Sequence, residues 1–395
     1  MLFSLLEYLL LAYFLYVVLY TATFALFGLF YQDPRANKSE KFLRFCVLIP
    51  CYKEDGIILD TAKTALTEKY PQDKYDVVII ADSLQSETIQ KLRELPIKVI
   101  PVSFENSTKV KSLNSAFAEL EDNYDYAVIL DADNVMAPDY LEKINNLVNA
   151  SSYKAVQGQR KPKNQNSTLA FLDGVSEAIN NHIFRQGTVW PGLSSSISGS
   201  GVAFQYSLIK SKLSTMESIG GFDRELELLL LKDGIKVYYY KQAIVYDEKV
   251  SKSQVFQNQR KRWISSQYFY LRKYFNSGMA ALLQGDFVFF NSAILRNVQL
   301  PRLINIGLFS FLMVVFFFLR AYLTVSFTWW LIMFVIYTVS IFISIPREFY
   351  SGKLLISIFR LPLIFLNMFL LLFKLKGANK KFIHTPHELP TEKKN

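Results

Sequence analysis

The chain has 395 residues, 51% of them hydrophobic, and a formal net charge of +10 at pH 7. It is too long for one small domain, and its apolar content is high for a wholly soluble protein. The charge favours an acidic partner such as an anionic lipid or a phosphorylated ligand. No long basic run with interleaved aromatic residues occurs, so we expect no nucleic-acid partner.

The first apolar segment, residues 2–30, is long enough to cross a bilayer, which takes about 20 apolar residues. A basic cluster follows at residues 35–44. Because cytoplasmic loops carry the excess of Lys and Arg, this order places the next part of the chain in the cytoplasm. We therefore predict a transmembrane helix in residues 1–32 and a cytoplasmic domain in residues 33–276.

The middle of the chain alternates short apolar runs with helix-like segments. Strands are predicted at residues 45–49, 76–81, 97–102, 126–130 and 155–157. Helices are predicted between them at residues 57–68, 87–95, 109–120 and 139–148. This alternation is typical of βαβ units, so we predict an α/β domain with a mainly parallel sheet.

Carboxylates follow three of the predicted strands: Glu54, then Asp82, then the pair Asp131 and Asp133. Ligands of parallel sheets bind at the carboxyl ends of the strands, so these side chains should meet at one edge. An Asp-x-Asp pair can hold a divalent metal ion on a diphosphate, because hard cations prefer carboxylate oxygens. The alternative is a polar turn after a buried strand.

A long helix is predicted over residues 251–275, just before the chain turns strongly apolar. Its residues Gln259, Arg262 and Trp263 are spaced i, i+3, i+4 and therefore share one face. An amide, a guanidinium and an indole are suited to clamp a phosphate-bearing group or a sugar. The other interpretation, an amphipathic helix on a membrane surface, is compatible with the first.

Two further membrane spans are predicted at residues 304–318 and 327–345. The next apolar stretch, residues 354–375, contains Arg360 and Pro362, which are unfavourable at a bilayer centre. If it crossed, the basic tail would lie outside, against the charge bias, so we predict an interfacial segment. The predicted organisation after the cytoplasmic domain is interfacial helices at 277–302, two spans at 303–346, and an interfacial or membrane helix with a basic cytoplasmic tail at 347–395.

Several motifs occur in a fixed order: Ile49-Pro50-Cys51-Tyr52-Lys53-Glu54, Asp82, Lys111-Ser112-Leu113-Asn114, Asp131-Ala132-Asp133, Gly199-Ser200-Gly201 and Gln259-Arg260-Lys261-Arg262-Trp263. Together they resemble glycosyltransferase family 2, in the membrane-embedded branch that holds the cellulose, hyaluronan and poly-N-acetylglucosamine synthases. The resemblance covers residues 45–275. It implies a GT-A fold, a Rossmann-like domain that binds a nucleotide sugar, and a UDP-sugar as donor.

The resemblance also implies roles for individual residues. Those assigned to the nucleotide sugar are Glu54, Asp82, Lys111, Asp131, Asp133, Arg262 and Thr385. Those assigned to the acceptor are Gly199, Ser200, Gly201, Gln259 and Trp263. Asp131 and Asp133 would also hold a Mg²⁺ or Mn²⁺ ion. For Lys111 an ordinary solvated helix lysine is the alternative.

The family pattern places the general base in a Glu-Asp pair before a Leu-rich helix that ends in Gly-x-Lys or Gly-x-Arg. Counting back from Gly234 puts Asp223 at the base position and Phe222 where the Glu belongs. The lost like charge and the desolvating phenyl ring push the pKa of the base in opposite directions. Asp223 is the predicted catalytic base and Glu225 the other candidate. Both could also be ordinary helix-start residues.

The tail sequence Phe382-Ile383-His384-Thr385-Pro386-His387 is similar to the gating loop of cellulose synthases, in which a Phe, a Thr and a basic residue cover the bound nucleotide. His387 replaces the Lys of that pattern, so its charge depends on pH. If the similarity holds, the tail is cytoplasmic and Thr385 contacts the nucleotide. A solvated basic tail is the alternative.

These observations predict an inverting, metal-dependent β-glycosyltransferase of the inner (plasma) membrane, with its catalytic domain in the cytoplasm among membrane lipids. It would move a sugar from a UDP-sugar to a growing polysaccharide or a glycolipid acceptor. Two alternatives stay open: addition of a single sugar to a lipid, and a non-catalytic nucleotide-sugar-binding subunit, suggested by Phe222. Three or four spans are few for a translocation channel, so secretion would need a homo-oligomer or an accessory subunit.

Overall fold

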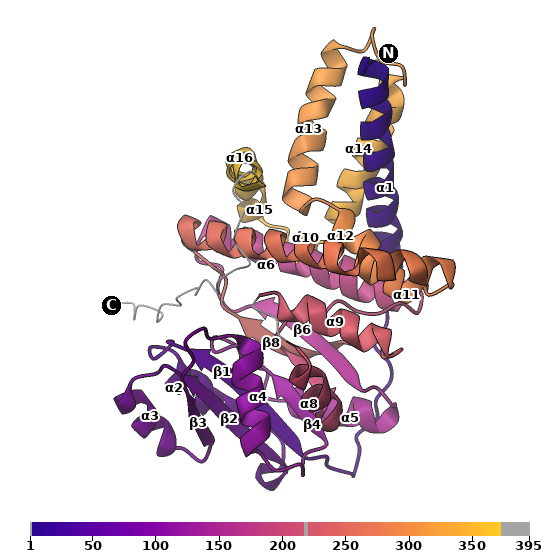
Figure 1. Ribbon diagram of the computed structural model, residues 1–395. Helices are drawn as coiled ribbons and strands as arrows, with labels where there is room; N and C mark the ends of the chain where they lie inside the picture. The colour runs from indigo at the N-terminus through magenta and orange to yellow at the C-terminus, as the bar shows by residue number, and fades with distance from the viewer. Residues whose placement is uncertain (1, 217–219, 373–395) are drawn as a thin grey trace.

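The computed structural model describes residues 2–216 and 220–372. Figure 1 shows three layers: an α/β domain at one end, a bundle of apolar helices at the other, and long helices crosswise between them. The bundle contains α1 (Leu2–Phe30), α13 (Arg302–Phe318) and α14 (Phe327–Ile343). Helices from the two ends of the described chain thus pack side by side, with the α/β domain inserted between them in sequence.

Eight strands of the described residues form one sheet, in the order β3-β2-β1-β4-β7-β6-β8-β5. Their bounds are β1 Phe45–Tyr52, β2 Tyr75–Asp82, β3 Lys98–Val102, β4 Tyr126–Ile129, β5 Val135–Met136, β6 Ala155–Pro162, β7 Val202–Gln205 and β8 Tyr238–Asp247. Strands β3, β2, β1 and β4 pair in parallel, as do β6 and β8. Strand β7 is antiparallel to β4 and β6, and β5 is antiparallel to β8.

The predicted α/β class is confirmed, but the sheet is mixed rather than mainly parallel. The main cause is β7, which enters through a loop whose glycines Gly199 and Gly201 have φ values of 78° and 64°. The backbone N–H of Gly201 donates to the carbonyl oxygen of Ile129 at 2.9 Å, so the chain reverses beside β4. Strands β5, β7 and β8 were not predicted. The first two are short, and exposed Lys241 and Gln242 interrupt the apolar run of β8.

Helices cover both faces of the sheet. The four predicted helices are confirmed with small shifts at their ends, as α2 Ile58–Ala65, α3 Ser86–Arg93, α4 Lys109–Glu119 and α5 Tyr140–Ala150. Alternate residues of β1 enter two separate cores, Val47 with Leu141 on one face and Leu48 with Leu113 on the other. Two more helices, α8 (Tyr206–Ser214) and α9 (Phe222–Lys232), pack into the second core. A short 3₁₀ turn, η1 (Gln72–Lys74), precedes β2.

Helices α6 (Thr168–Asn181) and α10 (Ser253–Leu283) lie crosswise between the sheet and the apolar bundle (Figure 1). α6 continues through the π-helical turn η2 (His182–Gln186) into α7 (Gly187–Val189). α10 confirms the helix predicted over residues 251–275 and is longer at its end. The elements that follow it are α11 (Phe287–Phe290), the π-helical turn η3 (Asn291–Leu295) and α12 (Arg296–Val298).

Within the described residues, α1 is the one helix that is long and apolar enough to cross a membrane alone. Two pairs of consecutive helices are long and apolar enough only when each pair is counted as one span. The segment Phe287–Val298 meets α13 at a bend of 53°. Helix α15 (Gly352–Ile358) meets α16 (Leu361–Leu372) at a bend of 48°. α14 is apolar and has 17 residues. The helix predicted at 1–32 is therefore confirmed as a candidate span, and the other spans stay predictions.

The stretch predicted to be interfacial folds as α15 and α16, after the 3₁₀ turn η4 (Arg347–Phe349). Met368 of α16 shares a buried cluster with Phe256 and Ile264 of α10 and with Ile304 of α13. α16 is thus attached to the crosswise layer, and its relation to a membrane surface stays a prediction. Thr385 and the gating-loop-like sequence lie outside the described residues.

Helix α1 is attached to the rest of the protein near both ends. The buried carboxylate of Glu7 accepts hydrogen bonds from the backbone N–H groups of Thr324, at 2.8 Å, and Val325, at 2.9 Å, in the loop between α13 and α14. Near its other end, Gly187 of α7 packs so closely that a Cβ atom there would overlap the carbonyl oxygen of Phe24. The glycine is therefore required for α1 to lie against α7.

Gly187→Ala is expected to destabilise the protein by about 1–3 kcal/mol, because α1 would have to move away from the new methyl group. The matched control is Gly352→Ala at the start of α15, where a Cβ atom meets nothing within 4 Å. Thermal unfolding in detergent should show a lower midpoint for the first variant and little change for the second. An unchanged midpoint for Gly187→Ala would mean that α1 is not held tightly against α7.

Candidate functional site

The carboxyl ends of β1 and β2 have a strained backbone. Lys53 and Ser83 directly follow these strands, and both have positive φ values, 56° and 59°. The backbone N–H of Lys53 donates to the carbonyl oxygen of Asp82 at 3.1 Å, which holds the two strand ends together. Non-glycine residues in this conformation cost free energy and gather at functional sites, so this edge of the sheet is a candidate site.

Two of the predicted carboxylates lie at this edge. Asp82 is buried, and its carboxylate accepts hydrogen bonds from the hydroxyls of Ser83 at 2.9 Å, Ser107 at 3.1 Å and Ser112 at 3.4 Å. Glu54 is buried just after the end of β1, the strand next to β2. The structure therefore brings these two residues together on neighbouring strand ends.

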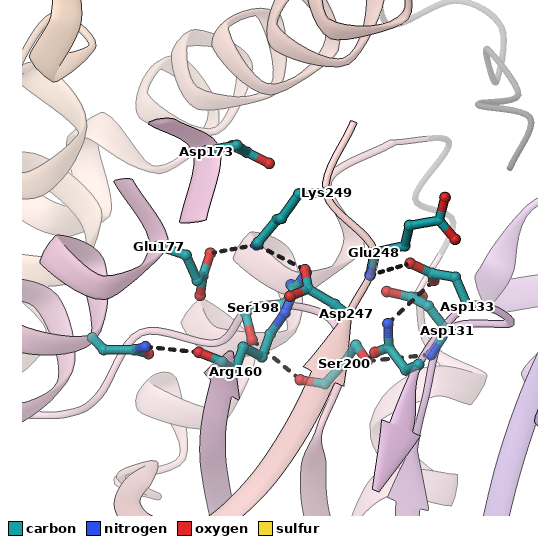
Figure 2. A network of polar contacts seen from close by, with 12 residues as sticks. Asp131, Asp133, Arg160, Asp173, Glu177, Ser198, Ser200, Asp247, Glu248 and Lys249 are labelled. Carbon is teal, nitrogen blue, oxygen red and sulfur yellow. Dashed lines mark hydrogen bonds and ion pairs between the residues drawn. The ribbon is translucent and has the colours of Figure 1, made fainter. Parts of the chain in front are cut away.

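Asp131 and Asp133 follow β4, which pairs with the other side of β1. The buried carboxylate of Asp133 accepts hydrogen bonds from the backbone N–H of Glu248 at 3.2 Å and from the amide of Asn134 at 3.1 Å. The backbone N–H of Asp131 donates to the hydroxyl of Ser200 at 3.2 Å. Figure 2 shows the two aspartates beside Glu248. The predicted pair thus lies next to the 199–201 loop.

Lys109, the first residue of α4, contacts this pair. Its ammonium forms an ion pair with Asp131 and donates a hydrogen bond to the carbonyl oxygen of Gly199 at 2.8 Å. Lys111 is exposed, and its ammonium donates instead to the carbonyl oxygen of Asn106 at 2.9 Å. The structure therefore places Lys109 at the aspartate pair, whereas the sequence had indicated Lys111.

The 199–201 loop lies against the start of α9. A Cβ atom on Gly199 would lie 3.6 Å from the Cβ of Asp223 and 3.4 Å from the ring of Phe222. The Phe222 ring has its centroid 5.0 Å from the ammonium of Lys109, a cation–π contact. Asp223 thus lies at the same end of the sheet as the aspartate pair, and Phe222 packs beside Lys109.

Glu225, the other candidate base, has different contacts. Its buried carboxylate forms an ion pair with Lys273 and accepts a hydrogen bond from the hydroxyl of Tyr270 at 3.2 Å. Both partners belong to α10. Glu225 therefore attaches α9 to α10.

Helix α10 brings a guanidinium toward Asp131 and Asp223. Burial lowers the pKa of Arg262, and the negative charges of Asp131 and Asp223 oppose that shift. On the same helix the side-chain oxygen of Gln259 is buried without a hydrogen-bond partner among the described residues. The ring of Trp263 is 40% exposed, and the guanidinium of Arg260 lies 4.3 Å from its centroid. Arg260 thus contacts Trp263 three residues further along the helix, and the binding role of the predicted face stays a prediction.

A network of buried ions lies between the sheet and α6 (Figure 2). Arg160 of β6 forms an ion pair with Asp247, the last residue of β8. The ammonium of Lys249 donates to Asp247 at 2.9 Å and lies 4.0 Å from the carboxylate of Glu177 on α6. Arg185 of η2 donates to the same glutamate at 2.8 Å. The network thus joins two strand ends to the crosswise layer.

These contacts keep the groups charged despite their burial. Burial lowers the pKa of Lys249, but neighbouring carboxylates, Asp247 first, raise it above the ordinary value. Burial raises the pKa of Glu177, yet Arg185 and two further cations hold it below its usual range. Because isolated buried charges are strongly unfavourable, each member requires the others.

A cavity of about 400 Å³ lies where the sheet end, the crosswise helices and the apolar bundle meet. Asp223, Ser198 and Trp263 line it, which places it next to the candidate site. Six arginines line its polar side: Arg160, Arg185, Arg224, Arg260, Arg296 and Arg302. Its other side is apolar and is formed by residues of α13, α14, α15 and α16.

Sequence reasoning missed the ion network and most of these arginines. One signal was present: Asp173 and Glu177 are four residues apart in an otherwise apolar run, a spacing that puts both on one helix face. Charges in such a run are expected to be paired. The partner of Asp173 is Arg260, which lies 87 positions away in the sequence, and the partner of Glu177 is Arg185. Neither pairing follows a local pattern, so the sequence alone does not identify these partners.

A family model described as glycosyltransferase like family 2 matches residues 44–266. The chain belongs to this family. The family and the strand order agree with a GT-A-like α/β fold, and the match includes the sheet, the strand-end carboxylates and residues Gln259–Trp263.

The chain is 28% identical over 260 residues to the probable glycosyltransferase YdaM of Bacillus subtilis (strain 168), an alignment that covers 61% of this chain and 59% of that protein. It is 26% identical over 170 residues to a poly-β-1,6-N-acetyl-D-glucosamine synthase of Staphylococcus epidermidis, which covers 41% of this chain and 40% of the synthase. The chain thus spans less than two thirds of the length of both relatives.

Among solved structures, the mannosyltransferase PcManGT from Pyrobaculum calidifontis, in complex with GDP-Man and Mn²⁺, is similar to this chain with a TM-score of 0.59 and 16% identity. The alignment covers 95% of this chain and 98% of that one. At this identity the likeness shows a shared fold over nearly the whole described length.

The pair Asp131 and Asp133 fits a divalent cation that is only partly coordinated by the protein. Mg²⁺-like ions in such sites take one or two protein carboxylates and complete their shell with substrate phosphates and water. Among the described residues, no group of three or more His, Cys, Asp or Glu side chains could hold a metal ion by itself. The pair therefore suits an ion that shares its coordination with a diphosphate.

Asp247→Asn is expected to destabilise the protein by about 3–5 kcal/mol, because Arg160 and Lys249 would face a neutral amide in a buried place. The control is Asp122→Asn, which removes the exposed ion pair with Lys210 and should cost less than about 1 kcal/mol. Thermal unfolding of both variants in detergent checks this. If Asp247→Asn unfolds like the wild type, the network does not determine stability.

Proposed function

We propose that this protein is an inverting, metal-dependent β-glycosyltransferase that moves a sugar from a UDP-sugar to an acceptor at the cytoplasmic face of the plasma membrane. The observation that carries the proposal is that Lys109 joins Asp131 to the 199–201 loop, against which Asp223 packs. Asp131 and Asp223 come from distant parts of the chain and yet lie at one end of the sheet. A diphosphate, a base and a cation are the groups that such a transfer needs. The solved structure that shares the fold is a complex with GDP-Man and Mn²⁺, which supports a nucleotide-sugar donor.

The strand-end carboxylates would bind the donor. Glu54 and Asp82 lie on neighbouring strand ends, where the nucleoside would lie. Asp131 and Asp133 would hold a Mg²⁺ or Mn²⁺ ion, which when bound stabilises the charge of the leaving diphosphate. Lys109, now paired with Asp131, would supply additional positive charge to the phosphate oxygens.

Asp223 would act as the general base. It lines the cavity and lies beside the 199–201 loop, whereas Glu225 is occupied by Lys273 and Tyr270. Asp223 takes the proton of the acceptor hydroxyl, whose oxygen attacks the anomeric carbon as the nucleoside diphosphate leaves. A single displacement of this kind inverts the anomeric configuration and needs only one base.

The acceptor would lie between the 199–201 loop and α10. The side-chain oxygen of Gln259, which has no hydrogen-bond partner within residues 2–216 and 220–372, could accept a hydrogen bond from a sugar hydroxyl, since buried polar atoms are usually paired. The exposed part of the Trp263 ring offers an apolar surface for a sugar or a lipid head group. Within the proposal, α13 and α14 would be the further membrane spans, and the acceptor would be a polysaccharide or a glycolipid.

Asp223→Asn is expected to lower the turnover number by about 100- to 10,000-fold, because the amide cannot take the acceptor proton as the proposed base does. Donor affinity should stay close to the wild-type value, since Asp223 acts on the acceptor. The measurement is UDP release by detergent-purified protein, with UDP binding followed by calorimetry. Glu225→Gln is the control and should lose far less turnover. If Asp223→Asn turned over as fast as the wild type, Asp223 would be excluded as the base. If the wild-type protein bound UDP but released none from any donor, a non-catalytic subunit would be favoured.

Removal of divalent ions by EDTA is expected to abolish UDP release, and added Mn²⁺ or Mg²⁺ should restore it. The reason is that the diphosphate leaves with a charge that Lys109 and Arg262 neutralise only in part. Asp133→Asn should raise the Mn²⁺ concentration needed for half-maximal rate. Full activity in EDTA would show that the transfer does not depend on a metal ion.

A further inference from the structure

The cavity beside Asp223 has a charged side and an apolar side, and neither is explained by the donor site. We propose, as an extension that rests on the proposed function, that its ligand is the acceptor and that this acceptor is an anionic membrane lipid. The phosphate of the head group would lie among the arginines, and the hydrocarbon chains would lie among α13, α14 and α16.

Among the described residues, two of the six arginines form no ion pair. Four of the six are paired with carboxylates: Arg160 with Asp247, Arg185 with Glu177, Arg260 with Asp173, and Arg296 with Glu227. The other two are paired only with neutral oxygens. Arg224 donates to the amide oxygen of Asn297, and Arg302 donates to the amide oxygen of Asn180. In the described part of the chain neither has a carboxylate within ion-pair distance.

These two cations are suited to an anion with several oxygens. Both are partly buried, and both line the cavity. Burial and the nearby Arg296 lower the pKa of Arg224, and the carboxylates of Asp223 and Glu227 oppose this shift only in part. A phosphate supplies the missing charge and accepts paired hydrogen bonds from a guanidinium fork. A neutral sugar supplies no charge.

The apolar side identifies the ligand as a lipid. It is lined by Ile306 of α13, Ile341 of α14, Ile345 just after α14, and Ile364 and Met368 of α16. The same helices carry other large apolar residues that are exposed, among them Phe311, Val314, Val335 and Val339. A hydrocarbon chain can therefore enter from a surrounding bilayer and remain in apolar contact. A polysaccharide would leave this side without a partner.

Asp223 lies where the two sides and the donor site meet, so a hydroxyl of the head group can react there. Its O–H proton goes to the carboxylate of Asp223, and its oxygen forms a bond to the anomeric carbon. The bond between that carbon and the diphosphate oxygen breaks, and the electron pair leaves with UDP. The products are a glycosylated anionic lipid and UDP.

The test uses the full chain in nanodiscs of phosphatidylcholine, with or without phosphatidylglycerol as the probe, because that lipid has a phosphate and free hydroxyls. Native mass spectrometry should show that phosphatidylglycerol is retained in preference to phosphatidylcholine. With a panel of radiolabelled UDP-sugars, labelled lipid should appear in the organic phase only when phosphatidylglycerol is present.

Arg224→Gln and Arg302→Gln should each weaken retention of phosphatidylglycerol roughly ten-fold, the loss expected for one charge-assisted contact. UDP binding should be unchanged, which also shows that the variants fold. The matched control is Arg272→Gln on an exposed part of α10, which should retain lipid normally. Ile306→Trp, which fills the apolar side, should also reduce retention.

Three results would overturn the proposal. One is unchanged retention in both arginine variants, and another is label in a polysaccharide regardless of lipid composition. The third is displacement of the lipid by soluble glycerol 3-phosphate at equal concentration, which would identify a site for free phosphate. A protein that binds no UDP would instead contradict the proposed function, and lipid retention would still decide whether the cavity takes an anionic lipid.

Discussion

The buried ion pairs between the sheet and the crosswise helices are the interaction on which the rest of the structure depends. They begin at the ends of β6 and β8, where Arg160 and Lys249 share Asp247. Glu177 extends them to α6. Further pairs reach α10 and α12, through Arg260 with Asp173 and Arg296 with Glu227.

Because each charge in this layer is desolvated, the pairs form together or not at all. The layer therefore fixes the distance between the catalytic edge of the sheet and the apolar bundle. The proposed transfer from a soluble donor to a membrane acceptor would need such a fixed distance, since misplacement of reacting groups by even about 1 Å can cost roughly 100-fold in rate.

Much of the fold could be predicted from the sequence where a local pattern determines it. The strands β1, β2 and β4 and their helices have clear periodicity, and Asp82, Asp131 and Asp133 follow them directly. Lys111 shows where such a prediction fails. Residues two positions apart point to different sides of a helix, and Lys109 rather than Lys111 contacts Asp131. The antiparallel β7 and the ion network depend on partners far away in sequence, which no local pattern can identify.

The replacement at Phe222 changes the electrostatics beside the base. In the family pattern a glutamate precedes the base and could pair with a nearby lysine. Here the ring makes only a cation–π contact with Lys109, so Asp131 is the charged partner of that lysine. In the proposed mechanism, in which Asp223 is the base and the diphosphate lies near Asp131, fewer negative charges would reduce the repulsion that an incoming donor must overcome.

The contact between Glu7 and the backbone of Thr324 and Val325 has a consequence for biosynthesis. The partners are separated by 317 and 318 positions in the chain, so Glu7 leaves the ribosome long before the groups that bind it. A carboxylate in an apolar helix is unfavourable until it is hydrogen-bonded. During synthesis the carboxylate of Glu7 therefore lacks these hydrogen bonds at first. The helical bundle can form completely only after most of the protein has been translated.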